Sequence, residues 1–445
     1  IHISASEQSA LQLNLVRSHA SGVGDPLPPE IVRLMMFLKL VTFAQGVSGV
    51  RLQVARQLCR FLQEDILPVI PSQGSVGASG DLAPMAHMAL ALIGEGTVTF
   101  RDREIPSLVA MKEAGIQPLQ LEPKEGLSLI NGTQLSTALA IQALLEARGI
   151  LNQADVVGAL SVEASLSTRS TFDPRIHALK AHPEQARVAG NLWKLLEESE
   201  IIISHQDCER VQDPYSIRCI PHVHGACREA FLAARRMVEG EINSVSDNPL
   251  ILNAQEVASS GHFHAEYIAQ SMDILALALS EIGGIAERRI HYFMKGIGDR
   301  IPPFLTRNPG LESGGMIAHV TAASLVSENK TLAHPASVDS IPTSGGQEDY
   351  VSMAPWAARK ALMICRNVRK ILAIELLINS RALVLHYQDL KPGKGSLAVL
   401  NLLQKRLKYP DGDYSMAEDI RRLDTLISEE ILLKTISKTI PMESL

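Results

Sequence analysis

A glycine-dense loop holds residues whose backbone could react with itself. It reads Gly74-Ser75-Val76-Gly77-Ala78-Ser79-Gly80-Asp81-Leu82-Ala83-Pro84 and lies between two apolar segments. Its glycines let the backbone reach positive φ and approach itself closely. A turn would bring the Gly80 nitrogen against the Ala78 carbonyl carbon, and loss of water with dehydration of Ser79 would leave an electron-poor alkene. The triplet alone is more typical of a tight turn before a helix, so the longer string must decide.

Other polar side chains have the types needed to bind a small amino acid. Tyr215 and Arg218 stand three residues apart after a proline, so a helix would place them on one face. A guanidinium suits a bidentate clamp on a carboxylate. Glu348 follows a glycine loop at the start of a long helical pattern. A core tyrosine, a solvated arginine and an acid that pairs with the helix dipole are the plain structural interpretations.

Three further residues have weaker signals. His19 lies in a stretch flanked by serine and glycine that predicts a loop. Asn131 precedes Gly132 in a predicted turn, and its amide can both donate and accept hydrogen bonds. Phe304 follows two prolines, and by itself it indicates only a core position.

Taken together, these stretches resemble the aromatic amino-acid ammonia-lyases and aminomutases. The glycine loop resembles their signature, and the resemblance continues over nearly the whole chain, most closely in the manner of the histidine ammonia-lyases. The other matching stretches are Glu125-Gly126-Leu127, Leu129-Ile130-Asn131-Gly132-Thr133, Val211-Gln212-Asp213-Pro214-Tyr215-Ser216-Ile217-Arg218, Ser246-Asp247-Asn248-Pro249-Leu250 and Gln347-Glu348-Asp349-Tyr350-Val351-Ser352-Met353.

The resemblance implies a prosthetic group and roles for several residues. Ala78, Ser79 and Gly80 would form 4-methylideneimidazole-5-one (MIO) autocatalytically. The residues around it would then be Asn131, Gln212 and Tyr215 beside the electrophile and the substrate amine, Arg218 on the substrate carboxylate, and Phe304 lining the pocket. No metal or dissociable cofactor is expected.

Two residues carry the choice of substrate. In the family a histidine in the context of His19 lies beside the substrate ring, and a carboxylate at Glu348 can accept an imidazole N–H, whereas phenylalanine and tyrosine lyases usually have glutamine there. The resemblance therefore implies a carbon-nitrogen lyase that converts L-histidine to trans-urocanate, the first step of histidine degradation. Tyrosine or phenylalanine ammonia-lyase, a 2,3-aminomutase and a non-catalytic homologue stay open. A fumarase-like lyase is disfavoured, because its Ser-Ser-x-Met-Pro-x-Lys-x-Asn signature has no match near residues 313–316.

Composition narrows the class of partner and the compartment. The chain of 445 residues has a net charge of −6, which gives no electrostatic reason to expect nucleic acid or an anionic membrane. Five cysteines without a C-x-x-C pair favour reduced thiols in the cytoplasm over a disulfide framework. The apolar window 268–285 contains two acids, so we expect a buried helix there. A small-molecule substrate is the expected partner.

Long helical patterns predict an all-α fold of the ammonia-lyase or fumarase-like bundle type. The expected helices span residues 4–17, 31–45, 52–67, 85–93, 137–151, 154–165, 225–243, 266–292, 316–328 and 353–380. Alternation over 97–106 gives the one convincing β element. We expect an N-terminal part (1–134), a central bundle (135–390) and a C-terminal helical appendage (391–445), integrated in one unit. Apolar helix faces and the resemblance both favour a homotetramer with shared active sites.

Three features stand apart from this pattern. Two His-x-His pairs, 222/224 and 262/264, invite a metal hypothesis, but no further ligands recur at a fixed spacing. His262 and Gly315 replace the asparagine and the phenylalanine usual in histidine ammonia-lyases, and Gly315 would enlarge a pocket or loosen a helix start. The first residue is Ile1, and the family's essential tyrosine lies upstream of it, so we expect a native N-terminal segment to be missing from this chain.

Overall fold

A computed structural model describes residues 3–4, 7–208 and 210–445. Helices dominate them, as the apolar periodicity predicted. In chain order they are α1 (Gln8–His19), α2 (Pro29–Ala44), α3 (Leu52–Gln63), α4 (Leu82–Leu92), α5 (Ser107–Glu113), α6 (Glu125–Ile130), α7 (Gln134–Ala164), α8 (Pro174–His177), α9 (Pro183–Leu195), α10 (Glu200–Ile203), α11 (Tyr215–Arg218), α12 (Ile220–Ile242), α13 (Glu266–Met294), α14 (Met316–Leu332), α15 (Ala354–His386), α16 (Lys394–Gln404), α17 (Ala417–Ser428) and α18 (Ile431–Ile436).

The chain divides into two compact units. The first unit comprises Ile1–Ala143, Ala234–Asp273 and Pro335–Lys360, and the second comprises Leu144–Ala233, Ile274–His334 and Ala361–Leu445. Each unit is thus assembled from three separated stretches, so residues distant in sequence meet inside it. The predicted division into 1–134, 135–390 and 391–445 concerns domains and stays a prediction.

Among the described residues, four helices exceed twenty residues, namely α7, α12, α13 and α15. The two helices expected over 137–151 and 154–165 are in fact one, α7. The polar pair Asn152-Gln153 does not interrupt it, because both residues are buried and the Gln153 amide donates to the carbonyl oxygens of Gly149 at 3.0 Å and Ile427 at 2.7 Å. A tertiary hydrogen bond to α17 therefore removes the reason for a break.

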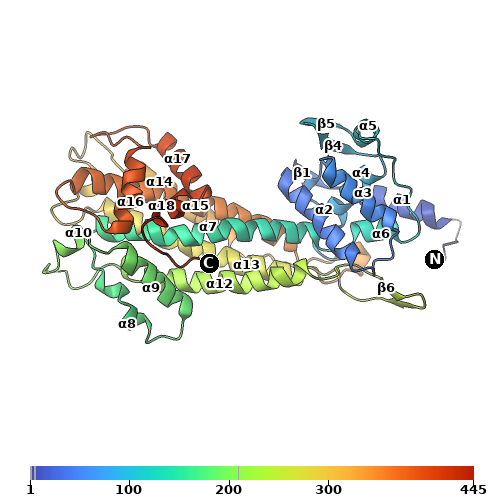
Figure 1. Cartoon of the computed structure of the whole chain (residues 1–445), viewed down its shortest axis with the longest axis horizontal. Coiled ribbons are helices and arrows are strands. Elements are labelled where there is room, and N and C mark those ends of the chain that lie inside the picture. Colours follow the sequence, from blue (N-terminus) through green and yellow to red (C-terminus); the bar gives the residue numbers. More distant parts are fainter. Residues whose placement is uncertain (1–2, 5–6, 209) are drawn as a thin grey trace. The chain divides into compact units, whose positions relative to one another are not determined.

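The second unit is a helical bundle with charged groups inside it. Figure 1 shows α16, α17 and α18 gathered together at the red end of the chain, and α18 packs against both of the others. Deeper in the unit, the fully buried Arg289 binds Glu375 with Nε–Oε1 at 2.5 Å, and Ser161 donates to the same carboxylate at 2.6 Å. This pairing satisfies charges that an apolar interior would otherwise exclude.

The first unit adds short strands to its helices. The predicted hairpin over 97–106 is confirmed as β4 (Thr97–Phe100) and β5 (Arg103–Pro106), which pair antiparallel. The expectation of a single β element is wrong, because β2 (Leu67–Pro68) extends this sheet and two further pairs form, β1 (Val23–Pro26) with β3 (Pro71–Gln73) and β6 (Leu250–Asn253) with β7 (Glu256–Ala258). Strands of two to four residues are too short to show alternation in the sequence.

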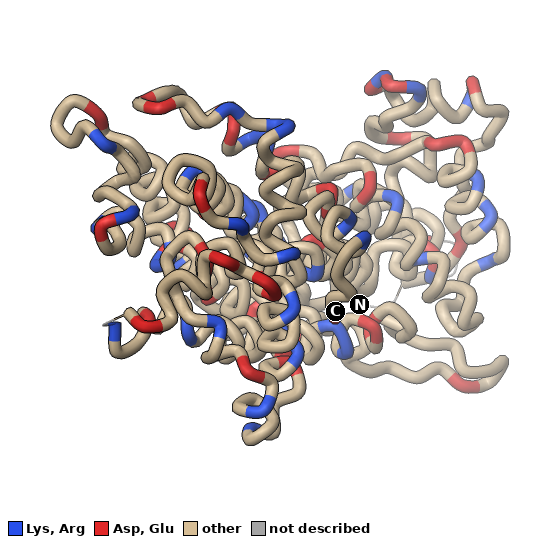
Figure 2. The backbone as a smooth tube through the Cα atoms, turned by 60° about the vertical axis from the view of Figure 1, so that its left-hand side comes forward, with Lys and Arg blue, Asp and Glu red and all other residues tan. Residues whose placement is uncertain are grey.

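Charged residues of both signs are spread along the chain, and one helix is notably apolar. In Figure 2 basic and acidic residues are interspersed along the backbone tube. Among the described helices, α13 is long and apolar enough to cross a membrane by length and composition, and 61% of its most apolar window is buried inside the fold. A core helix of a globular protein has the same character.

Candidate active site

The glycine loop lies between β3 and α4 in the first unit, and its backbone is held at Gly80. Gly80 has a φ of +83° and forms an isolated parallel bridge with Gly132. A Cβ on Gly80 would lie 2.3 Å from both the nitrogen and the oxygen of Gly132. Only glycine fits this contact and this left-handed conformation. The nitrogen predicted to close the ring therefore belongs to the least hindered residue available.

Asp81 anchors the end of the same loop. Its carboxylate is fully buried and accepts from the Ser136 backbone N–H at 2.8 Å and from the hydroxyls of Ser136 at 2.7 Å and Ser75 at 2.9 Å. Burial raises the pKa of Asp81, although these hydrogen bonds act in the opposite direction. The contacts fix the loop to the first turn of α7.

Ser79 and Glu348 are in direct contact. The Ser79 hydroxyl donates to Glu348 Oε1 at 2.5 Å, while the hydroxyls of Thr343 and Ser344 donate to Oε2 at 2.6 and 2.8 Å. Partial burial by itself would raise the pKa of Glu348, but the hydrogen bonds outweigh it and the pKa is lowered. An ionised carboxylate thus faces the triplet.

Asn131 ends α6 beside the loop. It is buried, its carbonyl oxygen accepts from Lys39 Nζ at 2.6 Å, and the next residue is the Gly132 that faces Gly80. Among the described residues nothing hydrogen-bonds its side-chain oxygen Oδ1. A buried amide with an unused acceptor is available to a ligand next to the triplet.

His19 is the last residue of α1, so the expectation of a loop position is wrong. Small residues follow it, and α1 continues through Ser18 before the chain turns. His19 Nδ1 lies 2.8 Å from the Leu15 carbonyl oxygen, which can only accept, so Nδ1 carries a proton, and in the neutral ring Nε2 is then the acceptor. His19 is half-buried.

Three predicted site residues occur together in the second unit, around α11. Arg218 Nη1 donates to Gln212 Oε1 at 2.8 Å. Tyr215 begins the helix and is 71% exposed. Tyr215 and Arg218 therefore lie on one short helix after Pro214, as predicted, and Gln212 precedes that helix.

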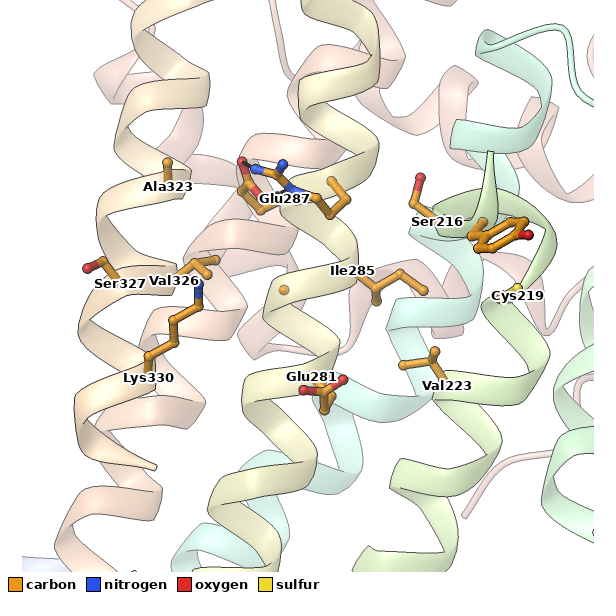
Figure 3. Close-up of a pocket in the computed structure, with 13 residues that line it drawn as sticks. Ser216, Cys219, Val223, Glu281, Ile285, Glu287, Ala323, Val326, Ser327 and Lys330 are labelled. Carbon is orange, nitrogen blue, oxygen red and sulfur yellow. Dashed lines mark hydrogen bonds and ion pairs between the residues drawn. The ribbon is translucent and has the colours of Figure 1, made fainter. Parts of the chain in front are cut away.

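Tyr215 lines an open groove with a volume of about 760 Å³. Figure 3 shows its walls: Ser216, Cys219 and Val223 lie on one side, Ala323 and Val326 on α14 lie on the other, and α13 runs between them. Lys330 and Glu281 add charge to this mostly apolar surface. The groove has room for a side chain or a small molecule.

Phe304 also belongs to the second unit. It is half-buried with a φ of +57°, and its carbonyl oxygen accepts from the Gly315 N–H at 2.8 Å. A Cβ on Gly315 would lie 2.8 Å from Ile378 Cδ1, so the space of the missing side chain is already filled. The expectation that Gly315 enlarges a pocket or loosens a helix start stays a prediction.

The histidine pairs have protein partners. His224 Nδ1 lies 2.9 Å from Asp155 Oδ1, the ring of His222 faces that of His177 at 5.6 Å, and His264 Nε2 lies 3.2 Å from the Tyr350 carbonyl oxygen. Within the described ranges no group of three or more His, Cys, Asp or Glu side chains is arranged to hold a metal ion.

Sequence reasoning missed Lys39, which is fully buried next to Asn131. A lone lysine inside the apolar pattern of 31–45 was the available signal, because lysine is almost never fully buried without a specific partner.

The helical fold and the glycine loop agree with the class that the sequence predicted, the aromatic amino-acid lyases. A family profile described as aromatic amino acid lyase matches residues 1–405, and the chain belongs to this family. Histidine ammonia-lyase from Myxococcus xanthus is 43% identical over 437 residues, which cover 98% of this chain and 86% of the relative. Histidine ammonia-lyase from Vibrio cholerae is 47% identical over 427 residues, covering 96% and 83%.

Solved structures agree with this assignment. Histidine ammonia-lyase from Trypanosoma cruzi superposes with a TM-score of 0.90 at 39% identity, covering 99% of this chain and 84% of that one. Tyrosine aminomutase from Streptomyces globisporus gives 0.92 at 34% identity, covering 100% and 88%. The predicted all-α, ammonia-lyase-type fold is confirmed.

Proposed function

We propose that this protein eliminates ammonia from L-histidine to give trans-urocanate, the first step of histidine degradation. The contact between the Glu348 carboxylate and Ser79 carries the proposal, because it puts an ionised acceptor for an imidazole N–H at the triplet. The relatives named histidine ammonia-lyase support the same substrate. An aromatic hydrocarbon ring, as in phenylalanine, would gain nothing from a partly buried carboxylate.

The residues at the triplet fit the prosthetic group that the family implies. Gly80 is held in a left-handed turn that admits no side chain, Ala78 is buried and small, and the unused Asn131 Oδ1 lies in the segment that faces them. Formed from Ala78, Ser79 and Gly80, MIO supplies an electrophile for the substrate amine.

The chain's own side chains would orient the substrate. Arg218 would bind the substrate carboxylate, and its hydrogen bond to Gln212 would orient the guanidinium. Glu348 would accept the N–H of the substrate imidazole. His19 Nε2 would accept another polar hydrogen of the substrate. Such fixed contacts lower the entropic part of the barrier and place charge where it develops.

Tyr215 and Phe304 would complete the surroundings of the reacting carbon and amine. Tyr215 is largely exposed at the open groove, an environment that a second subunit would cover. We therefore extend the proposal to a cytoplasmic homotetramer whose active sites draw on several subunits. Its partners are the small amino-acid substrate and copies of itself, with no role for nucleic acid or membrane.

The decisive experiment measures ammonia release from L-histidine, L-tyrosine and L-phenylalanine in parallel, for the full-length gene product and for Glu348→Gln. Glu113→Gln is the matched control, since Glu113 pairs with Arg103 at the surface. Turnover of histidine that is lost in Glu348→Gln and kept in Glu113→Gln is the expected result.

Other outcomes identify the competing functions. Release of ammonia from tyrosine or phenylalanine alone would reassign the substrate while keeping the electrophile. Formation of a β-amino acid would indicate an aminomutase, and a peptide of unchanged mass across the triplet would indicate a non-catalytic homologue.

A further inference from the structure

Lys39 is a buried cation that packing does not explain. It lies on α2 with no exposed surface, and its Nζ donates to the Asn131 carbonyl oxygen at 2.6 Å and lies 5.2 Å from the centre of the Phe43 ring. Burying an ammonium costs several kcal/mol unless strong hydrogen bonds offset it. A methionine would fill the same volume without that cost, so the charged donor itself has a use.

The segment that Lys39 holds is the one that supports the triplet. The Gly132 carbonyl oxygen accepts from the Asp81 N–H at 2.7 Å, and Gly132 is bridged to Gly80. Thr42, one turn along α2 from Lys39, accepts from Gln134 Nε2 at 3.2 Å. Helix α2 therefore ties down both ends of residues 131–134.

Lys39 stays an ammonium at neutral pH. Burial lowers the pKa of Lys39 to about 8, and this is the largest influence, while Asp247 raises the pKa and Lys124 lowers it further. Asp247 is fully buried and also receives Lys124 Nζ at 3.3 Å. A charged donor makes a hydrogen bond roughly twice as strong as a neutral one, which suits a fixed carbonyl.

We propose that Lys39 is a positioning residue for ring formation: by fixing the Asn131 carbonyl it holds Asn131-Gly132 against Gly80, in the turn from which the ring closes. The inference rests on the proposed function, since it requires that the triplet form the ring. In that step a bond forms between the Gly80 nitrogen and the Ala78 carbonyl carbon. The Ala78 oxygen leaves as water with the amide protons of Ser79 and Gly80, and the Ser79 hydroxyl leaves as a second water with the Ser79 α-proton.

The test follows ring formation by mass, without a substrate. After a short induction of the full-length protein, synthesis is arrested and the tryptic peptide Phe61–Arg101 is weighed over time, since ring formation removes two water molecules from it. Lys39→Met is expected to form the ring about tenfold more slowly than wild type, the effect of losing one charge-assisted buried hydrogen bond. Lys39→Arg keeps a charged donor and is expected to restore part of the rate.

Lys360→Met is the matched control. Lys360 is a second buried lysine of the first unit, but it pairs with Asp273 at 3.3 Å. The Lys360→Met variant should form the ring at the wild-type rate, even if thermal melting shows that it loses as much stability as Lys39→Met. Should Lys39→Met not fold, Lys39→Gln gives the same comparison with a neutral polar side chain.

Two results would overturn the positioning role alone: a wild-type rate in Lys39→Met, or an equal slowing in Lys360→Met. A wild-type peptide that never loses two waters would instead overturn the proposed function, and this inference with it.

Discussion

The two groups of predicted site residues differ in how completely the chain itself positions them. In the first unit, Gly80 and Asn131 are buried, and Ser79 is hydrogen-bonded to Glu348. In the second unit, Tyr215 is 71% exposed beside an open groove, and Arg218 donates to Gln212 in the segment just before its helix. The first group is preorganised by its own unit, whereas the second presents side chains to whatever covers it.

This difference teaches where each kind of requirement is met. Ring closure within the backbone needs atoms fixed within a few tenths of an ångström, and a packed interior with several hydrogen bonds supplies that. Recognition of a mobile substrate needs an accessible cation, and an exposed helical turn supplies that. Changes in the triplet and its glycine contact should therefore abolish chemistry, and loss of the Arg218 guanidinium should weaken binding.

The largest effect is expected for Gly80→Ala. The added Cβ would meet the Gly132 backbone at 2.3 Å in a left-handed conformation, so the turn for ring closure cannot form and turnover should fall on the order of a thousandfold. The assay is urocanate formation together with the mass of Phe61–Arg101. Gly190→Ala, where a Cβ meets nothing within 4 Å, should keep both at wild-type values.

A pH dependence of stability is expected from Lys39. Its pKa is lowered to about 8 in the folded protein from 10.5, so the unfolded chain binds the proton more tightly. Stability relative to Lys39→Met therefore rises as the pH increases from 8 to 10.5, by about 3 kcal/mol in the free energy of unfolding.

Urea unfolding at fixed protein concentration measures this difference. The difference in the free energy of unfolding between wild type and Lys39→Met should stay constant between pH 6 and 7.5, where Lys39 is charged in the folded and the unfolded protein. A difference that does not change up to pH 10.5 would show that Lys39 is not the buried cation described.

A smaller effect is expected for Arg218→Gln in the open group. Loss of the guanidinium should raise KM for histidine about tenfold, because one charge-assisted hydrogen-bond pair to the substrate carboxylate is lost. The change in kcat should be smaller. Arg422→Gln, which breaks a surface pair with Glu418, should leave both parameters unchanged. A fall in kcat with KM unchanged would remove the distinction between the two groups.

The smallest effect is expected for Thr343→Val. Thr343 donates to Glu348 at 2.6 Å and helps to lower the pKa of that carboxyl, so its loss should move the acid limb of the kcat/KM profile to higher pH. Turnover at pH 7 should hardly change, because glutamate stays ionised there. Ser324→Ala removes a hydroxyl that donates to the Thr321 carbonyl oxygen on its own helix, and it should not move the acid limb.

Much of the fold followed from the sequence because helices are local. Apolar periodicity predicted the long helices and the 97–106 hairpin, and the glycine loop was recognised from consecutive residues. Prediction failed where tertiary contacts compete with local signals. Gln153 continues α7 because α17 offers it a carbonyl oxygen, and the shortest strands exist only as pairs.

The sequence by itself determined the residue types of the site, because each residue's side-chain chemistry follows from its identity. These residues are the triplet together with Glu348, Asn131 and Arg218. Only the tertiary structure decided which of them touch. Ser79 is hydrogen-bonded to Glu348, which lies 269 positions away in the sequence, and Lys39 is hydrogen-bonded to Asn131, which lies 92 positions away. Such pairings depend on how distant segments pack, and burial then changes the charge and hydrogen bonding of each group in ways that residue type alone does not specify.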